Sequence, residues 1–247
     1  MNKIRFYFSD DLHKFTKKRK VFGCAEFEYQ RKSSIKDLVE SYNIPHTEIG
    51  KILCRNKELG FNYYPKQGDD IYVFGINKPV NVKEETKLRP VAFDEIKFIA
   101  DANIGKAAVL IRALGYDALW ENDIDDSELT QIAYNEDRVV LTRDIDLLKR
   151  KIVNHGMYIN SSDPFEQTKL VIERFGLKGP FDLFSRCTRC NAKLNKVSKE
   201  QIYERLLPKT KLYYNEFFLC PDCEKIYWKG SHREKIIKDF KRYGIII

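Results

Sequence analysis

The chain has 247 residues, which is enough for one large domain or for two or three small ones. Its apolar fraction of 43% is ordinary for a folded protein, whereas its charged fraction of 32% is high. No apolar run is long enough to cross a membrane, and the N-terminal segment 1–6 lacks the apolar core of a signal peptide. We therefore expect a cytoplasmic protein without a membrane partner.

The net charge of +8 is concentrated near the C-terminus. Residues 183–247 hold 15 Lys or Arg and 7 Asp or Glu, a surplus of eight, whereas residues 1–182 hold 29 of each sign. A basic C-terminal domain predicts a polyanionic partner, most often a nucleic acid. The alternative is that the charge serves solubility alone.

Residues 1–76 have the pattern of a small domain. We expect strands at 4–8, 21–29, 49–55 and 71–74, a turn at 17–20, and a helix over 34–42 that is capped by Ser33 or Ser34. Cys24 and Cys54 fall on these strands and are expected to be packed thiols. The order strand, strand, helix, strand, strand is that of a ubiquitin-like β-grasp domain.

Two stretches of this domain resemble the small ubiquitin-like sulfur carriers, namely Ser-Ile-Lys-Asp-Leu-Val-Glu and Gln-Gly-Asp-Asp-Ile-Tyr-Val-Phe. Those carriers end in a free Gly-Gly tail, whereas this chain continues through Phe74-Gly75-Ile76-Asn77. We therefore expect a docking or RNA-contact module with a protein partner, and not a sulfur-transfer domain.

A polar, charged segment at 77–92 has the composition of a linker. Strands and helices then alternate through 93–182. We expect strands at 96–100, 117–120, 138–142 and 157–160, and helices at 105–114, 127–135, 146–151 and 164–175. This alternation predicts an α/β domain with a parallel sheet and crossover helices.

Acidic residues lie where the predicted strands end. Asp101 and Asp144 each follow a strand, Asp126 opens a helix on the same rim, and Asp146 comes two residues after Asp144. Ligands of such sheets bind at the carboxyl ends of the strands. Neighbouring carboxylates repel unless a cation lies among them, and Mg²⁺ or Mn²⁺ is the natural choice. The alternative for each aspartate alone is a turn former or a helix cap.

Several stretches carry a family resemblance: Phe-Ile-Ala-Asp-Ala-Asn-Ile-Gly-Lys, Ile-Arg-Ala-Leu-Gly-Tyr-Asp-Ala-Leu, Asp-Ile-Asp-Asp-Ser-Glu-Leu and Val-Val-Leu-Thr-Arg-Asp-Ile-Asp-Leu-Leu. Residues 95–160 resemble PIN-like ribonucleases, and 95–242 resemble the mut-seven C-terminal RNase family. Prokaryotic members often carry a ubiquitin-like domain in front, and we expect residues 1–76 to be such a domain.

The resemblance implies metal-dependent cleavage of RNA. It assigns catalysis and Mg²⁺ or Mn²⁺ binding to one set of acids: Asp101, Asp126, Asp144 and Asp146. Many PIN domains add a glutamate on an intermediate helix, which has no clear counterpart here. Asp123, Asp125 and Glu128 are its candidate substitutes.

Three basic residues accompany the acids. Lys106, Arg112 and Arg143 are candidate contacts of RNA phosphates. The alternatives are structural ion pairs for the two arginines and a solvated side chain for Lys106.

Two Cys-x-x-Cys motifs lie 29 residues apart. Together they supply the ligands of a closed tetrahedral zinc site, Cys187, Cys190, Cys220 and Cys223. Four thiolates leave no open coordination position, so this zinc should stabilise the fold and take no part in hydrolysis. The motifs predict a zinc ribbon.

Basic and aromatic residues surround both motifs, a combination that can hold phosphates and stack unpaired bases. Arg189, Lys229 and His232 are the candidate RNA contacts, and Trp228 serves either the core or RNA. The sequence Tyr-Trp-Lys-Gly-Ser-His at 227–232 resembles a motif of the same family. A structural histidine is the alternative for His232.

These observations predict four segments: a β-grasp domain at 1–76, a linker at 77–92, a PIN-like nuclease domain at 93–182 and a zinc-ribbon RNA-binding module at 183–247. The predicted function is a metal-dependent ribonuclease in which a carboxylate-bound metal activates water. The alternative is an inactive RNA-binding or adaptor protein of the same fold. A sulfur-carrier partner is a third hypothesis, which the β-grasp domain alone suggests. The sequence does not indicate an oligomeric state.

Overall fold

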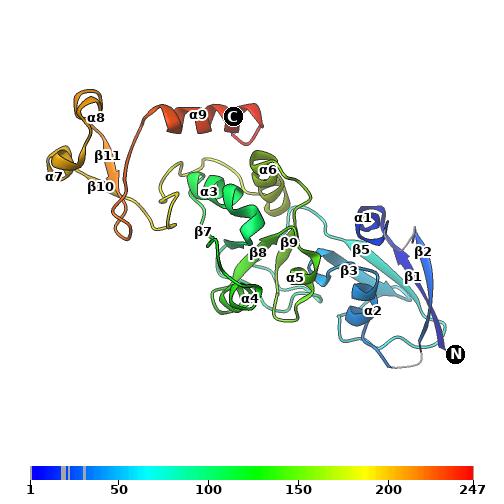
Figure 1. Ribbon diagram of the computed structural model, residues 1–247. Helices are drawn as coiled ribbons and strands as arrows, with labels where there is room; N and C mark the ends of the chain where they lie inside the picture. Colours follow the sequence, from blue (N-terminus) through cyan, green and yellow to red (C-terminus); the bar gives the residue numbers. More distant parts are fainter. Residues whose placement is uncertain (1, 18–20, 22, 30–31, 247) are drawn as a thin grey trace.

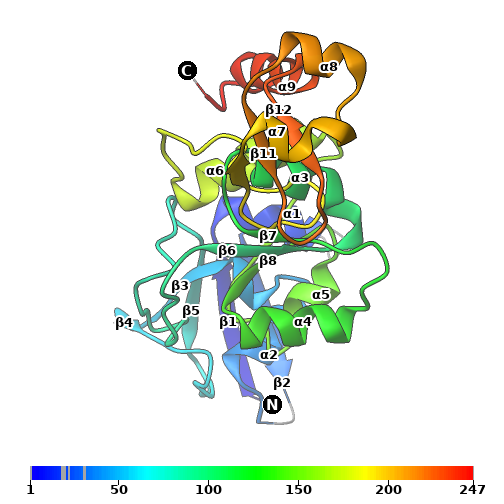
Figure 2. The same cartoon turned by 90° about the vertical axis from the view of Figure 1, so that its left-hand side faces the viewer.

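The computed structural model describes residues 2–17, 21, 23–29 and 32–246. Three regions follow one another along the molecule, with the N-terminal domain at one end and the C-terminal ribbon at the other (Figures 1 and 2). No helix in this part of the chain has the length and apolar composition of a membrane span.

The N-terminal domain is the expected β-grasp fold. Its sheet has the order β2-β1-β5-β3-β4, in which β1 and β5 are parallel and the other pairs are antiparallel. Ser34 caps α2 in a capping box with Asp37. Ser34 is one of the two caps that the sequence predicted. The elements are β1 (Asn2–Phe8), η1 (Asp10–Leu12), α1 (His13–Thr16), β2 (Cys24–Tyr29), α2 (Ile35–Ser41), η3 (His46–Glu48), β3 (Ile49–Cys54), β4 (Lys57–Glu58) and β5 (Asp70–Gly75).

Two details of this domain differ from the expectation. Helix α1 was not predicted, although it buries Phe15 against the core. Cys54 is buried as expected, and burial raises the pKa of its thiol, but Cys24 is exposed. The predicted turn at 17–20 lies, apart from Lys17, outside the described residues.

The expected linker is packed against both neighbouring regions. Val82 and Leu88 are buried, and the backbone N–H of Val80 donates to the carbonyl of Arg174 at 2.8 Å. Arg89 donates to the carbonyl of Thr47 in the β-grasp domain, also at 2.8 Å. Polar composition predicted a linker here because the few apolar residues of the segment are widely spaced.

The middle region is a parallel sheet with the order β7-β6-β8-β9. Helices α3 and α6 cover one face of the sheet, and α4 and α5 cover the other, so the region has three layers. This confirms the predicted α/β architecture. The elements are β6 (Lys97–Ala100), η4 (Ala102–Ile104), α3 (Gly105–Ala113), β7 (Ala118–Leu119), α4 (Asp126–Asn135), β8 (Arg138–Thr142), α5 (Ile145–Lys149), β9 (Gly156–Tyr158) and α6 (Pro164–Phe175).

The C-terminal region contains a three-stranded antiparallel sheet with the order β10-β11-β12. Its last helix, α9, leaves this sheet and returns to the middle region, where Ile236 and Phe240 pack with Leu110 and Leu114 of the α3 segment (Figure 1). The ribbon is therefore held at both of its ends. The elements are β10 (Asn195–Val197), α7 (Lys199–Ile202), η5 (Tyr203–Arg205), α8 (Pro208–Tyr213), β11 (Phe217–Leu219), β12 (Ile226–Trp228) and α9 (Ser231–Arg242).

The turn η3 joins the β-grasp domain to the parallel sheet. Glu48 accepts a hydrogen bond from the backbone N–H of Tyr158 at 2.8 Å, and its carboxylate lies 3.1 Å from Arg174. Both charged side chains of this pair are almost fully buried. His46 bridges Glu40 and the carbonyl of Val153 at 2.7 and 2.8 Å.

We predict that Glu48→Gln destabilises the whole chain. The change leaves the Arg174 guanidinium buried without its counter-charge, a situation that typically costs about 3–5 kcal/mol. Urea unfolding should show a lower midpoint. Glu28→Gln, which removes an exposed partner of Lys3, is the matched control and should change stability by less than about 1 kcal/mol. Equal effects of the two substitutions would contradict the buried ion pair.

We also predict a stability loss below neutral pH that depends on His155. Burial, aided by Arg89, lowers the pKa of His155 from 6.5 to about 4. A histidine with a depressed pKa stabilises the fold fully above pH 6.5, and this stabilisation is lost as the pH falls from 6.5 towards 4. At pH 5 the loss is about 2 kcal/mol. His155→Gln should flatten the dependence of the unfolding free energy on pH over this range, and an unchanged slope in this variant would contradict the prediction.

Candidate active site and metal centre

Two of the predicted acids lie at the ends of neighbouring strands. Strands β6 and β8 pair in parallel with Ala100 opposite Leu141, so Asp101 and Thr142 come next at the same edge. The Thr142 hydroxyl donates to the Asp101 carboxylate at 2.9 Å and accepts from the backbone N–H of Asp144 at 2.8 Å. Thr142 thus links Asp101 to Asp144.

The four acids differ in their partners. Asp126 lies 3.2 Å from Arg150, and Asp146 lies 2.9 Å from Lys149. Asp101 and Asp144 form no ion pair with any Lys or Arg of the described residues. Among the described residues, no Lys or Arg side chain therefore lies within ion-pair distance of these two carboxylates.

The four carboxylates are not gathered tightly. In the described ranges, the only group of three or more acid, His or Cys ligands with all ligand atoms within 4.8 Å of one another is formed by cysteines. The candidate substitutes for the family's glutamate lie near α4. Asp125 caps this helix, and the N–H groups of Glu128 and Ser127 lower its pKa. Asp123 and Glu128 are exposed.

A hollow of about 350 Å³, which we call the α3 hollow, begins at Ala102, the residue after Asp101. It is lined by Asn103, Lys106, Val109, Trp120, Ser162 and Gln167, among others. Gly105 at its floor has to lack a side chain, because a Cβ atom would collide with the indole of Trp120. Lys106 is exposed and forms no ion pair with a described acid, so it remains free to meet an anion.

Arg112 has a structural role. It is 1% exposed, and its guanidinium donates to backbone carbonyls of Ala118 at 2.7 Å and of Arg189 at 2.9 Å. The predicted phosphate contact is not accessible to RNA in this arrangement. Arg112 instead fastens the first cysteine motif to the end of α3.

The other predicted RNA contacts lie on the surface. Arg143 and Arg189 are exposed, and His232 is exposed in the first turn of α9. Lys229 is exposed as well, but it pairs with Glu216, which also binds Lys196. Arg143 belongs to the carboxyl edge of the sheet around Asp101 and Asp144, which we call the acidic rim. The other three residues belong to the ribbon.

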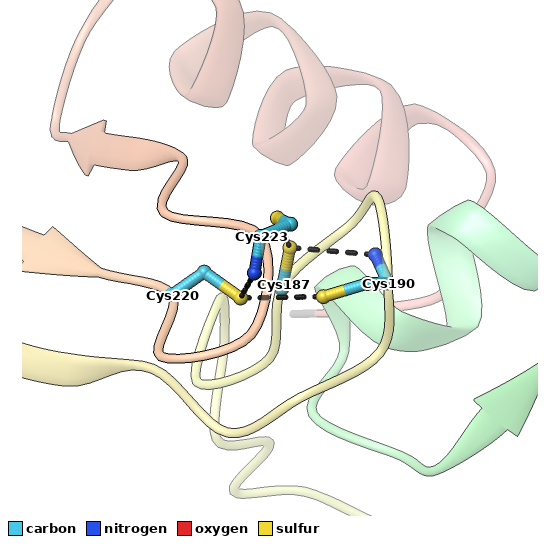
Figure 3. A group of neighbouring side chains, drawn as sticks. All are labelled: Cys187, Cys190, Cys220 and Cys223. Atoms are coloured by element: carbon cyan, nitrogen blue, oxygen red, sulfur yellow. Dashed lines mark hydrogen bonds between the residues drawn. The ribbon is translucent and has the colours of Figure 1, made fainter.

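The four cysteines of the ribbon converge on one point (Figure 3). The sulfur of Cys187 lies 3.5 Å from that of Cys223, and the sulfur of Cys190 lies 3.2 Å from that of Cys220. A tetrahedral zinc ion with Zn–S bonds of about 2.3 Å has S–S edges of about 3.8 Å, close to these separations. The cluster can therefore hold one metal ion, and its all-sulfur donor set suits zinc.

Electrostatics within the cluster favours a cation. Burial opposes ionisation of Cys187, but donors including the Tyr227 hydroxyl and the N–H of Cys190 outweigh it and lower its pKa to about 6. Burial and the neighbouring thiols raise the pKa of Cys190 to about 12. Four thiolates at this spacing cannot all ionise without a positive charge between them.

A buried polar cluster fixes the first cysteine motif to the parallel sheet. Asp117 forms ion pairs with Arg138 and Arg186 and accepts from the Asn191 side chain at 2.8 Å. Burial opposes ionisation of Asp117, but the bonds from Arg138 and Asn191 outweigh it and hold its pKa below the usual value. Asn191 also accepts from the N–H of Ala118 at 3.1 Å.

Sequence reasoning missed the roles of Thr142 and Asn191. Thr142 stands inside the Thr-Arg-Asp element, and its place at the end of a buried strand, two residues before Asp144, was the available signal. Asn191 follows the first cysteine motif at a positive φ of 75°, a conformation that asparagine tolerates. Nothing in the sequence indicated its partner Asp117, 74 residues earlier.

We predict that purified protein carries one zinc ion per chain and that Tyr227→Phe weakens its retention. The Tyr227 hydroxyl lies 3.1 Å from the Cys187 sulfur, and loss of such a supporting donor lowers metal affinity by about 10- to 100-fold. Competition with a chromophoric chelator measures the change. Tyr213→Phe, at a tyrosine that is 70% exposed, is the matched control and should retain zinc like the wild type. A zinc content well below one per chain would contradict the site itself.

Comparison with known proteins identifies two family domains in the same order as the structural regions. The Mut7-C RNAse domain matches residues 96–240, and the Mut7-C ubiquitin domain matches residues 1–81. No curated protein and no solved structure matches the chain. The first match covers more than half of the chain and includes both the acidic rim and the cysteine cluster. The name of that domain indicates a nuclease-type function. The chain belongs to the Mut7-C RNAse domain family.

Proposed function

We propose that the chain is a metal-dependent ribonuclease whose active centre lies at the carboxyl edge of the parallel sheet. The observation that carries this proposal is the pair Asp101 and Asp144, joined through Thr142 and lacking a cationic partner among the described residues. A carboxylate pair in this state attracts a divalent cation. The ribonuclease name of the matched domain supports the same conclusion.

The residues at this edge fit Mg²⁺ or Mn²⁺ in their chemistry, since all the donors are carboxylate oxygens. Asp101 and Asp144 would hold the ion, with Asp126 and Asp146 as supporting acids after release from Arg150 and Lys149. A bound ion would neutralise a phosphate oxygen and lower the pKa of a water for attack on phosphorus. Thr142 orients Asp101, and Lys106 is placed to hold the RNA backbone.

The ribbon serves substrate binding in this proposal. Residues 183–247 carry a surplus of eight positive charges, and about six remain when four thiolates hold a zinc ion. RNA phosphates would be attracted to this region and away from the acidic rim, which repels RNA without its metal. Arg189 and His232 are exposed there, and Arg143 lies at the rim itself.

The β-grasp domain has an exposed face that suits a protein partner. Tyr72 and Phe74 project from β5 and are 43% and 38% exposed, and Tyr72 stacks on Tyr7 with ring centroids 4.7 Å apart. Exposed aromatic residues are enriched in protein interfaces. We propose this face as the partner-binding side of the domain.

An RNA-binding protein without cleavage is the second candidate function. One observation that favours it is that, among the described residues, no three of the acids have all their ligand oxygens within 4.8 Å of one another. The other is that the family's further glutamate has no clear counterpart. The basic ribbon would serve such a protein equally well. Only an activity measurement separates the two functions.

We predict that Asp101→Asn and Asp144→Asn each lower RNA cleavage with Mn²⁺ by about 100-fold or more, because several kcal/mol of transition-state stabilisation depend on the ion that they hold. Asp126→Asn and Asp146→Asn should lower it less, since each acid has a cationic neighbour. Gel assays on single-stranded and structured RNA measure the rates.

The matched control for this experiment is Asp137→Asn at the opposite end of β8, where asparagine tolerates the positive φ of 53°. It should cleave like the wild type. Wild-type cleavage that survives in Asp144→Asn would refute the proposed centre, and binding without any cleavage would establish the second candidate function.

A further inference from the structure

A second hollow, of about 400 Å³, lies between the ribbon and helices α3 and α9. We call it the ribbon pocket. Its volume is in the usual range of ligand sites. Aromatic side chains from several segments contribute to its walls: Phe184, Tyr214, Phe218, Tyr227 and Trp228. Such flat side chains offer stacking surfaces to a planar group.

Cations line the same pocket. The Lys225 ammonium lies over the ring of Tyr227 at 5.3 Å from its centroid, and the Arg233 guanidinium lies over Phe184 at 4.7 Å. Exposed His232 adds a third polar group at the rim. A pocket with aromatic walls and a cationic rim favours a ligand that is both planar and anionic.

The ribbon pocket adjoins the α3 hollow. Val109 lines both of them, one helical turn after Lys106. The α3 hollow in turn includes Asn103, whose side-chain amide lies 3.4 Å from the Asp101 carboxylate. The two hollows therefore meet at Val109, and the second of them contains Lys106 and the Asn103 neighbour of Asp101.

We propose that the ribbon pocket binds one unstacked base of a single-stranded RNA while the backbone crosses Lys106 towards Asp101. The inference rests on the proposed ribonuclease function and adds to it a base subsite at a distance from the scissile phosphate. A nucleotide combines the required planar and anionic parts. Bases inside a duplex cannot enter such a pocket, so single strands and loops are the substrates that it selects.

The charge around the pocket favours RNA over a protein segment. Asp and Glu are absent from the residues that line the pocket, whereas Lys225, His232 and Arg233 are present. The pocket also opens within the region that carries the chain's positive surplus. A peptide that filled it would have to bring acidic groups beside an aromatic side chain, and a nucleotide brings both in one unit.

Phe218→Leu in the full-length chain is the test. The change keeps an apolar side chain and removes the aromatic face. Binding to fluorescent single-stranded RNA is measured in the Asp144→Asn background, so that cleavage does not interfere. Stacking of one base predicts a loss of affinity of about five- to 150-fold. Lys225→Gln should lower the salt dependence of binding by about one unit of slope.

Matched controls lie outside the pocket. Tyr213→Leu removes an aromatic side chain that is 70% exposed, and Lys235→Gln removes an exposed cation of α9. Tyr213→Leu should leave affinity unchanged, and Lys235→Gln should leave the preference for a base unchanged. Zinc content and the thermal midpoint of each variant confirm that the ribbon is folded.

A scan with single abasic residues places the base relative to the cleaved bond. In the Asp144→Asn background one abasic position should weaken binding, at a fixed offset from the bond that the otherwise wild-type chain cleaves. Phe218→Leu should remove this position dependence. Tight binding that is equal for RNA with and without bases, or for duplex and single strand, would overturn the proposal, as would capture of an acidic peptide by the pocket in preference to RNA.

The experiment separates the base subsite from the ribonuclease function. If cleavage at low RNA concentration depends on Asp144 but is unaffected by Phe218→Leu, the subsite is refuted and the ribonuclease function is supported. If the wild-type chain does not cleave RNA but its affinity depends on the base and on Phe218, the subsite is supported and the ribonuclease function is refuted. A chain whose RNA affinity is unaffected by either the base or Phe218 contradicts the subsite directly.

Discussion

The half-buried carboxylate of Asp117 joins the ribbon to the parallel sheet. It lies before β7, contacts Arg138 at the start of β8, and receives Arg186 and Asn191 from the first cysteine motif. Together with Arg112, which binds the carbonyl of Arg189, this side chain sets the ribbon against the sheet. The position of the ribbon relative to the acidic rim, and with it any path for RNA, depends on this contact.

Opposite charges are separated across the molecule in a way that suits a polyanionic substrate. The unpaired acids Asp101 and Asp144 lie at the carboxyl edge of the sheet, whereas the ribbon is anchored near the other edge and carries the positive surplus. Helix α3 runs between the two regions and has Lys106 near its start and buried Arg112 near its end. Lys106 is exposed to solvent, whereas Arg112 is buried and stabilises the fold.

Local rules predicted most of the fold and the elements that carry the site. The apolar run of β8 and the Pro164-to-Phe175 segment of α6 have the bounds that the sequence indicated, because strand pattern, Pro at the first turn and Gly176 after the last are local signals. The cysteine spacing likewise predicted a cluster that the structure brings together. The role of Arg112 was not predictable, since one of its partners is the carbonyl of Arg189, 77 residues away. The packing of 77–92 and of α9 also depends on distant surfaces that have no local signature.

The contact of Glu48 with Tyr158 has a consequence for the exposed edge of the parallel sheet. Strand β9 is the last strand of the parallel sheet, so its outer side would present unpaired backbone groups to solvent. Exposed strand edges invite pairing with other chains and aggregation. Turn η3 of the β-grasp domain covers part of this edge and receives the Tyr158 N–H. The ubiquitin-like domain therefore shields the nuclease-type domain from self-association, in addition to any partner that it binds.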